Sequence, residues 1–125
     1  MEMKIIKNNR KFFVGKNKNI TLTDVGSIFL KDNENITFKN SKKMEYDICK
    51  KNWGYYGTPS LNKRLDKFGF IGAFVKNKAL KTYAVMIVDK GKKKLFLRYL
   101  KKEDMILICW LSENNLKKIN KTFKK

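Results

Sequence analysis

The sequence predicts an α+β fold in which an N-terminal β-meander precedes a ferredoxin-like β-α-β-β-α-β unit and a C-terminal helix. Residues 1–43 contain short alternating apolar segments separated by turn-forming residues. Residues 44–125 alternate strand-like segments with segments of helical periodicity. The chain has 125 residues, of which 42% are hydrophobic, and this size and composition predict a single globular domain over 1–125.

The meander portion is expected to contain four short strands. Apolar and β-branched residues alternate or cluster in each of them, and turn-forming residues separate them. A break is expected at Asp24-Val25-Gly26 and a turn at 32–35. The predicted strands cover residues 12–15, 20–23, 27–30 and 36–39.

The α/β portion, residues 44–125, is predicted to start with a strand over 44–50 and a loop over 51–57. A helix over 59–67 follows, because Thr58 can cap it and Pro59 suits its first position. An apolar stripe at helical spacing, Leu95, Phe96, Tyr99 and Leu100, predicts a second helix that turns this stripe to the core. The remaining predicted elements are strands 70–75, 81–88 and 105–111, the second helix over about 92–102, and a C-terminal helix capped by Ser112. The competing architecture is a mixed sheet continuous with the meander and flanked by two or three helices.

The net charge of +19 points to an anionic partner, because a strongly basic domain is typical of nucleic-acid binders. The 27 Lys, 3 Arg and 13 Asn fit an AT-rich genome, but such a bias does not explain why only 11 acidic residues are present. Residues 41–125 hold 22 of the basic residues and 7 of the acidic ones. Since Lys offers point charges where Arg offers a planar fork, binding should be directed at the nucleic-acid backbone and should be sensitive to salt.

One group of lysines lies around the second predicted helix. We interpret it as a polyanion-binding surface without base selectivity, and the alternative is an ordinary solvated helix face. The residues are Lys90, Lys92, Lys93, Lys94, Lys101 and Lys102.

Catalysis is disfavoured. The chain has no histidine, and its two cysteines, Cys49 and Cys109, lie sixty residues apart with no CxxC motif. Neither GxxxxGK[ST] nor GxGxxG occurs. We therefore expect no catalytic residues, no metal site and no cofactor. We find neither a membrane-spanning segment nor a signal peptide in the sequence. The predicted location is therefore the cytoplasm, without membrane association.

The most unusual segment, residues 53–64, gathers three aromatic residues, two glycines and the only proline. Aromatic rings stack on bases or sugars, and the start of a helix offers free N–H groups to a phosphate. The alternative is that the aromatic residues close one end of the core and that Thr58-Pro59 is an ordinary cap. The predicted ligand-binding residues are Trp53, Tyr55, Tyr56, Thr58, Ser60, Asn62, Lys63 and Arg64.

The segment WGYYGTPSLNKRL at 53–65, with Phe68-Gly69-Phe70 and Cys109-Trp110-Leu111, resembles a family of small uncharacterised bacterial proteins. The resemblance runs from about Ile20 to Leu111. It implies a bacterial, cytoplasmic origin and carries no known activity.

Three functions are compatible with the sequence. The first is a non-catalytic basic module that binds a polyanion, in the first place RNA or single-stranded DNA. The second is an accessory protein or enzyme that binds a small phosphorylated or nucleotide-sugar ligand at the helix start near Thr58–Arg64. The third is a protein-interaction domain that docks an acidic partner.

Overall fold

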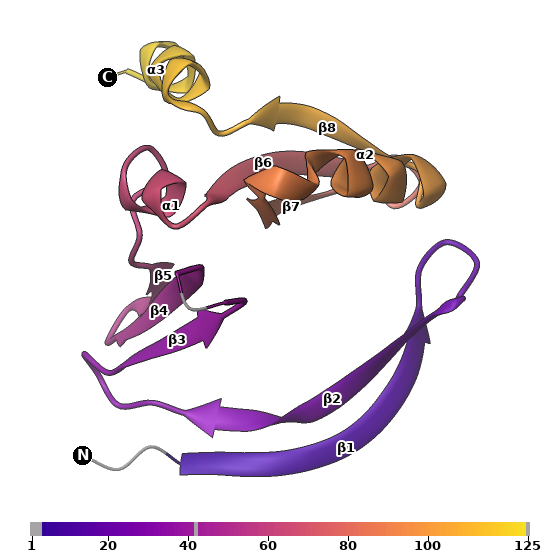
Figure 1. The fold of residues 1–125 in the computed structure, drawn as a ribbon, viewed down its shortest axis with the longest axis vertical. Coiled ribbons are helices and arrows are strands. Elements are labelled where there is room, and N and C mark those ends of the chain that lie inside the picture. The colour runs from indigo at the N-terminus through magenta and orange to yellow at the C-terminus, as the bar shows by residue number, and fades with distance from the viewer. Residues whose placement is uncertain (1–3, 42, 125) are drawn as a thin grey trace. The chain divides into compact units, whose positions relative to one another are not determined.

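The computed structural model describes residues 4–41 and 43–124 and is an α+β structure with antiparallel sheets and three α-helices (Figure 1). It divides into two compact units. The first consists of the residues up to Thr37 together with Asp47–Thr58, and the second of Phe38–Tyr46 together with the chain from Pro59 onward. The elements are β1 (Lys4–Val14), β2 (Ile20–Phe29), β3 (Asn35–Lys39), β4 (Glu45–Lys51), β5 (Gly54–Gly57), α1 (Arg64–Lys67), β6 (Phe70–Asn77), β7 (Thr82–Asp89), the 3-10 turn η1 (Lys90–Lys92), α2 (Lys93–Lys102), β8 (Met105–Trp110) and α3 (Glu113–Thr122).

In the first unit, β1 and β2 form a long antiparallel hairpin (Figure 1). The predicted break at residues 24–26 is wrong, because β2 runs through it. The extra residue is instead on β1, between Lys7 and Arg10, where the register shifts. Gly26 is required opposite this bulge, since a Cβ at that position would lie 2.3 Å from the Ile6 carbonyl oxygen.

The segment 51–57, predicted as a loop, forms most of a second hairpin. Lys51 pairs with Gly54 and Lys50 with Tyr55, so the turn between β4 and β5 consists of Asn52 and Trp53. The loop that precedes β3 is tied to β4, because the Asn33 amide donates to the Lys50 carbonyl at 2.7 Å and the Lys50 amide donates to the Glu34 carbonyl at 2.9 Å. This hairpin positions the aromatic residues of the candidate site.

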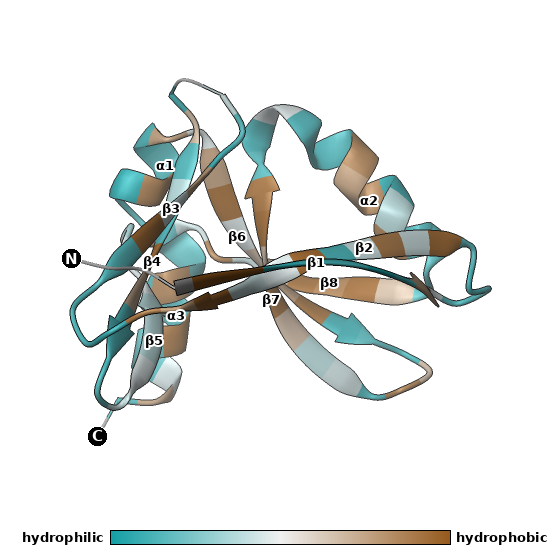
Figure 2. Ribbon diagram, turned by 90° about the horizontal axis from the view of Figure 1, so that it is seen from below, coloured by the Kyte–Doolittle hydropathy of each residue, from teal (hydrophilic) through white to brown (hydrophobic). Residues whose placement is uncertain are grey.

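In the second unit, a three-stranded antiparallel sheet of order β7-β6-β8 carries α2 on one face. Figure 2 shows hydrophobic residues along β6 and β8 and at intervals along α2. Register places Ala73 opposite Met86 and Trp110, and Val75 opposite Ala84 and Leu107, so these side chains share one face. The buried core on this face consists of Ala73, Val75, Val88 and Leu100.

The predicted ferredoxin-like order is not confirmed. That arrangement needs the strand at 44–50 inside the same sheet as the three later strands, but β4 pairs in the sheet β3-β4-β5. The competing prediction of one continuous mixed sheet is also wrong, because the strands in the described ranges form three separate antiparallel sheets.

Of the three predicted helices, two are confirmed and one begins later in the chain than predicted. The helix expected over 59–67 is wrong in its start, since α1 begins only at Arg64 and has four residues. The second helix is confirmed as η1 and α2. The C-terminal helix is confirmed with its cap, as the Ser112 hydroxyl accepts a hydrogen bond from the Asn115 amide at 3.3 Å.

Candidate nucleic-acid interface

Three exposed aromatic side chains occupy the hairpin of β4 and β5 in the first unit. Trp53 is 68% exposed, Tyr55 63% and Tyr56 42%. Gly54, at φ +142, follows the two-residue turn in a conformation that other residues rarely adopt. The alternative in which these rings close a core is therefore wrong for Trp53 and Tyr55, because most of the surface of both residues is exposed.

The hairpin presents its rings on two faces. Tyr55 lies opposite Lys50 across the ladder, and the Lys50 ammonium sits 5.9 Å from the Tyr55 ring centroid. Tyr56 lies opposite Cys49, on the other face. Its ring stacks with that of Trp53, with centroids 5.9 Å apart and planes inclined by 22°. Flat, rigid rings of this kind are suited to stacking on bases.

Two lysines of the same hairpin, Lys50 and Lys51, are not among the predicted site residues. Lys50 Nζ donates to Asp32 Oδ1 at 3.0 Å and to the Lys51 carbonyl at 2.6 Å, so its charge is partly compensated. Lys51 Nζ donates to the amide oxygen of Asn33 at 2.7 Å, a neutral partner that does not offset the lysine charge. The proximity of Lys50 to Tyr55 follows from the two-residue turn, which the sequence analysis did not recognise. We call Lys50, Lys51, Trp53, Tyr55 and Tyr56 the hairpin cluster.

The other half of the predicted ligand segment does not form the expected anion receptor. The Ser60 carbonyl accepts hydrogen bonds from the amides of Lys63 and Leu65 at 3.2 and 3.1 Å, and the Ser60 hydroxyl accepts from the Arg64 amide at 3.3 Å. The helix start expected at Pro59 therefore does not form, and the amides around the actual start of α1 are already bonded within the loop. The expected cap at Thr58 is wrong, because Thr58 lies six residues before α1 and its amide donates to the Asp47 carbonyl at 3.0 Å.

The side chains of Asn62 and Arg64 also make contacts within the second unit. The Asn62 amide group donates to Glu113 Oε2 at 2.7 Å, which fixes the loop before α1 to α3. The guanidinium of Arg64 lies 5.5 Å from the Phe68 ring centroid. The predicted ligand-binding residues are divided between the two units. The first unit contains Trp53, Tyr55, Tyr56 and Thr58, and the second contains Ser60, Asn62, Lys63 and Arg64.

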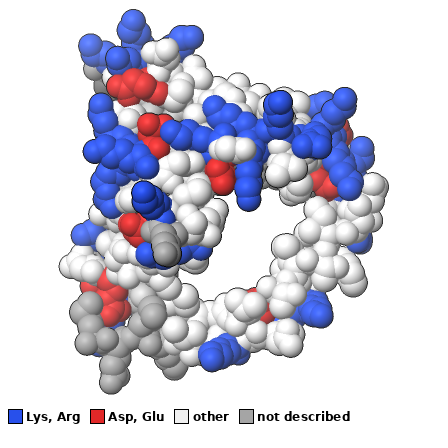
Figure 3. Space-filling model, in the orientation of Figure 1, with Lys and Arg blue, Asp and Glu red and all other residues white. Residues whose placement is uncertain are grey.

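The second unit carries most of the charge. It contains 21 Lys and Arg and six Asp and Glu, a net charge of +15, against +4 for the first unit. Figure 3 shows Lys and Arg side chains gathered over α2.

Within α2, three exposed cations follow one another at spacings of four residues: Lys94, Arg98 and Lys102. We call these three residues the α2 strip. No ion pair reaches them from the parts of the chain that the structure describes. Arg98 Nε makes only a long contact, 3.5 Å, to the Lys94 carbonyl oxygen. The sequence prediction missed Arg98, although its spacing from Lys94 and Lys102 was the signal for it.

Two of the six predicted surface lysines interact with other side chains, and the other four are exposed. Lys90 Nζ is paired with Asp66 Oδ1 at 2.6 Å, and Lys93 is half-buried with its ammonium 5.0 Å from the Trp110 ring centroid. Lys92, Lys94, Lys101 and Lys102 remain exposed.

The predicted apolar stripe of α2 is correct only in part. Phe96 and Leu100 pack into the core, whereas Leu95 and Tyr99 are exposed beside the strip. Leu95 and Tyr99 line an open groove of about 380 Å³ between α2 and β7.

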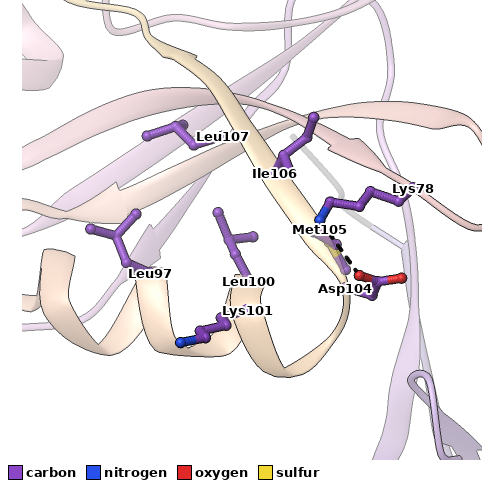
Figure 4. Close-up of a pocket in the computed structure, with 8 residues that line it drawn as sticks. All are labelled: Lys78, Leu97, Leu100, Lys101, Asp104, Met105, Ile106 and Leu107. Atoms are coloured by element: carbon purple, nitrogen blue, oxygen red, sulfur yellow. Dashed lines mark ion pairs between the residues drawn. The ribbon is translucent and has the colours of Figure 1, made fainter.

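A groove of about 430 Å³ lies between the C-terminal half of α2 and β8. Its walls are mainly apolar, and an ion pair of 3.7 Å between Lys78 Nζ and Asp104 Oδ1 lies at its rim. Figure 4 shows Lys78 directed at Asp104 and Lys101 pointing away from them. Because Lys78 is already paired, the groove does not form an anion site of its own.

Comparison of the chain with protein-family models, curated proteins and solved structures found no match. The resemblance of residues 53–65 to a bacterial family therefore stays a prediction. In the described ranges, no group of three or more Cys, Asp and Glu residues is arranged to hold a metal ion. Nor does any helix described there have the length and apolarity needed to cross a bilayer.

Proposed function

We propose that this protein is a non-catalytic binding module for a polyanion, in the first place single-stranded RNA or DNA. The observation that carries the proposal is the hairpin cluster, in which exposed aromatic rings share a hairpin with two lysines and the Lys50 ammonium lies beside the Tyr55 ring. Proteins that bind single strands combine aromatic stacking platforms with cations that meet the phosphates. A mainly Lys surface favours contacts to the backbone over the reading of bases. Location in the bacterial cytoplasm stays a prediction from the sequence.

The α2 strip supports the same function. Its cations have no acidic partner among the described residues, and like charges at spacings of four destabilise a helix slightly. Arrangements that cost stability in the free protein are typical of binding surfaces. A polyanion would neutralise the strip and release the counterions condensed on its own phosphates.

The alternative of a small phosphorylated or nucleotide-sugar ligand has less support. It depended on free N–H groups at a helix start, and the amides of Lys63, Arg64 and Leu65 are instead bonded to Ser60. A helix of four residues also has only a weak dipole.

The test is fluorescence anisotropy of labelled poly-dT and poly-rU oligonucleotides of several lengths, titrated between low and about 150 mM salt. Stacking is worth about 1–3 kcal/mol per base, so Trp53→Ala or Tyr55→Ala should raise Kd about 5- to 150-fold. Tyr83→Ala is the matched control for Tyr55→Ala, because Tyr83 is also exposed and lies 5.6 Å from a lysine ammonium, that of Lys76.

Three results would contradict the proposal. One is binding that disappears by about 150 mM salt. Another is an equal loss of affinity in Tyr55→Ala and Tyr83→Ala. The third is tight binding of mononucleotides with no gain from length, which would favour the small-ligand alternative instead.

A further inference from the structure

β7 is an edge strand of the three-stranded sheet in the second unit. The order of this sheet is β7-β6-β8, so within the described residues β7 pairs with β6 alone. The pairing continues without a register shift from Thr82 to Asp89. Between these two residues β7 contains no charged residue and no proline, which natural edge strands use to prevent further pairing. The edge of β7 is therefore able to accept another strand.

Alternate backbone groups of β7 point away from β6. Just beyond the end of the ladder, the Lys90 amide donates to the Gly69 carbonyl at 2.9 Å, and these two residues continue the register of the strands. Hydrogen-bonded and non-bonded pairs alternate in an antiparallel ladder, so the even-numbered residues of β7 bond to β6. The amides and carbonyls of Tyr83, Val85 and Ile87 therefore face the edge. None of the loop and turn hydrogen bonds in the described ranges reaches them.

The groove of about 380 Å³ between α2 and β7 runs beside this edge. On the strand, Met86 and Val88 turn their side chains to the α2 side, because both belong to the core beneath the helix. On the helix, Leu95, Phe96 and Tyr99 recur at spacings of three and four residues and form the facing wall. A strand added to β7 would place every second side chain in this apolar groove.

The helix side of the groove is basic. Arg98 and Lys102 each follow a lining residue, Leu95 and Tyr99, by three positions, so they lie beside these residues on the helix surface. Neither cation has an ion pair in the parts of the chain that the structure describes. Lys92 adds a further cation to the lining itself. A segment that combines apolar with acidic side chains is complementary to this arrangement.

The charge also favours a partner protein over a second copy of this chain. Asp89 is the acidic residue among those that line the groove, and its carboxylate accepts a hydrogen bond from the Gly91 amide at 2.8 Å. It therefore caps η1 and offsets little of the positive rim. A second copy would bring another unit with a net charge of +15 against this rim.

The other edge of the sheet is less suited to strand addition. The ladder between β6 and β8 shifts register between Phe74 and Val75, which leaves Ile108 as an extra residue on β8. A bulge of this kind bends an edge strand and interrupts its pairing. The groove beside β8 also has the Lys78–Asp104 ion pair at its rim. β7 instead combines regular pairing with cations that no acidic residue offsets in the described ranges.

From the regular edge, the apolar groove and the basic rim, we propose that β7 binds an extended acidic peptide of a partner protein as an added strand. Main-chain hydrogen bonds supply affinity in this mode of recognition, and pockets for alternate side chains supply specificity. The proposal goes beyond nucleic-acid binding and does not rest on it. It shares Arg98 and Lys102 with the α2 strip but uses no residue of the hairpin cluster.

The test is fluorescence polarisation of a fluorescein-labelled peptide, DEVTITVED, titrated with the full chain at about 0.15 M salt without nucleic acid. Its three apolar residues share one face of a strand, and its ends are acidic. We expect saturable binding with a Kd below about 100 µM. Leu95→Glu should raise Kd about tenfold or more, because it replaces an apolar contact with a like charge. Leu97→Glu is the matched control, since it adds the same charge to the β8 side of the same helix, and should raise Kd less than about threefold.

Two N-methylated peptides test whether the ligand adds as a strand. Successive N–H groups of a strand point to opposite edges, so the valines and the threonines direct theirs to different sides. Methylation of both valines and methylation of both threonines should therefore have unequal effects. One change should raise Kd about tenfold or more, and the other should have little effect.

Four results would overturn the proposal. The first is no saturable binding up to about 200 µM protein. The second is an equal loss in Leu95→Glu and Leu97→Glu, which would mean that binding follows net charge. The third is an equal effect of the two methylated peptides, which would exclude an added strand. The fourth is a homodimer in sedimentation equilibrium that Leu95→Glu dissociates, which would assign the groove to a second copy.

Trp53→Ala separates this proposal from nucleic-acid binding. Because Trp53 lies in the first unit, this variant should bind the peptide like the wild type, even where it loses affinity for oligonucleotides. An equal loss for both ligands would contradict a peptide site at β7. Far-UV circular dichroism of the Leu95 and Leu97 variants checks that α2 is retained.

Discussion

The α2 strip should lower the stability of the free protein, and its removal should raise it. We consider the triple variant Lys94→Gln, Arg98→Gln, Lys102→Gln. It removes two repulsive pairs at spacings of four residues, worth about 0.2–0.5 kcal/mol each. Lys94 also opposes the helix dipole in the first turn and Lys102 favours it in the last, so these two effects, each about 0.3–1 kcal/mol, nearly cancel. Helix propensity changes little, because Gln, Lys and Arg are similar. The net gain is about 0.4–1 kcal/mol, or about 2–5 °C in Tm.

The assay is thermal unfolding of wild type and variant at 20 mM and 1 M NaCl. The gain should be present at low salt and vanish at 1 M, where the Debye length falls to about 3 Å. A control variant with Lys11, Lys39 and Lys67 changed to Gln removes the same charge from three separate elements. Equal stabilisation by the control would show that net charge matters and the strip does not. A gain that persists at 1 M salt would refute the electrostatic explanation.

Two further predictions concern the packing of the core and the ionisation of Tyr46. Leu65→Ala should lower the free energy of unfolding in urea by about 2–5 kcal/mol, because Leu65 is fully buried. Leu80→Ala, on an exposed turn, should lower it by less than about 0.5 kcal/mol. Similar losses in the two variants would contradict the packing around α1. Burial raises the pKa of Tyr46 above its ordinary value near 10, so the folded state holds this proton more tightly than the unfolded state. The stability that this contributes is present below pH 10 and is lost as pH rises through the folded pKa. Absorbance at 295 nm should show ionisation above pH 10 that Tyr46→Phe removes, and an unchanged titration curve would contradict it.

The parts of the fold that the sequence predicted well have local causes. The sheet strands of the second unit follow apolar alternation or an apolar run, α2 follows a helical stripe, and α3 follows the Ser112 cap. The β6–β7 hairpin also agrees with prediction, since Asn77 and Thr82 close it. Each of these signals lies within a few residues of the structure it determines.

The errors come from pairing between distant residues. β1 begins at Lys4 and includes the polar residues 7–11, which were not predicted as strand. These residues form a strand because β2 pairs with them through hydrogen bonds. β5 has glycine at both ends and no alternation, so only its ladder with β4 makes it a strand. Thr58 and Pro59 resemble a helix start, but α1 begins only at Arg64, where Ser60 accepts hydrogen bonds from the amides of Lys63, Arg64 and Leu65. The sheet to which β4 belongs likewise has no local signal.

The candidate site was predicted in composition but not in arrangement. The aromatic residues at 53–56 were selected for their type, and only tertiary structure decides that they face solvent. Lys90 and Lys93 were selected for their charge, and their partners Asp66 and Trp110 lie far away in sequence. Arg98 is different, because its spacing in the helix was readable from the sequence alone.

The division of the chain into two units bears on the kind of ligand. The exposed stacking surfaces belong to the first unit, and the uncompensated cations of α2 belong to the second. A mononucleotide offers one base and one phosphate group, so it can use only a small part of these two resources. A longer strand that occupies one cluster raises the effective concentration of its remaining length at the other. Affinity should then rise with oligonucleotide length in a step rather than smoothly. Substitution of the residues of either cluster should remove this step. It should leave unchanged the affinity of short oligonucleotides for the other cluster.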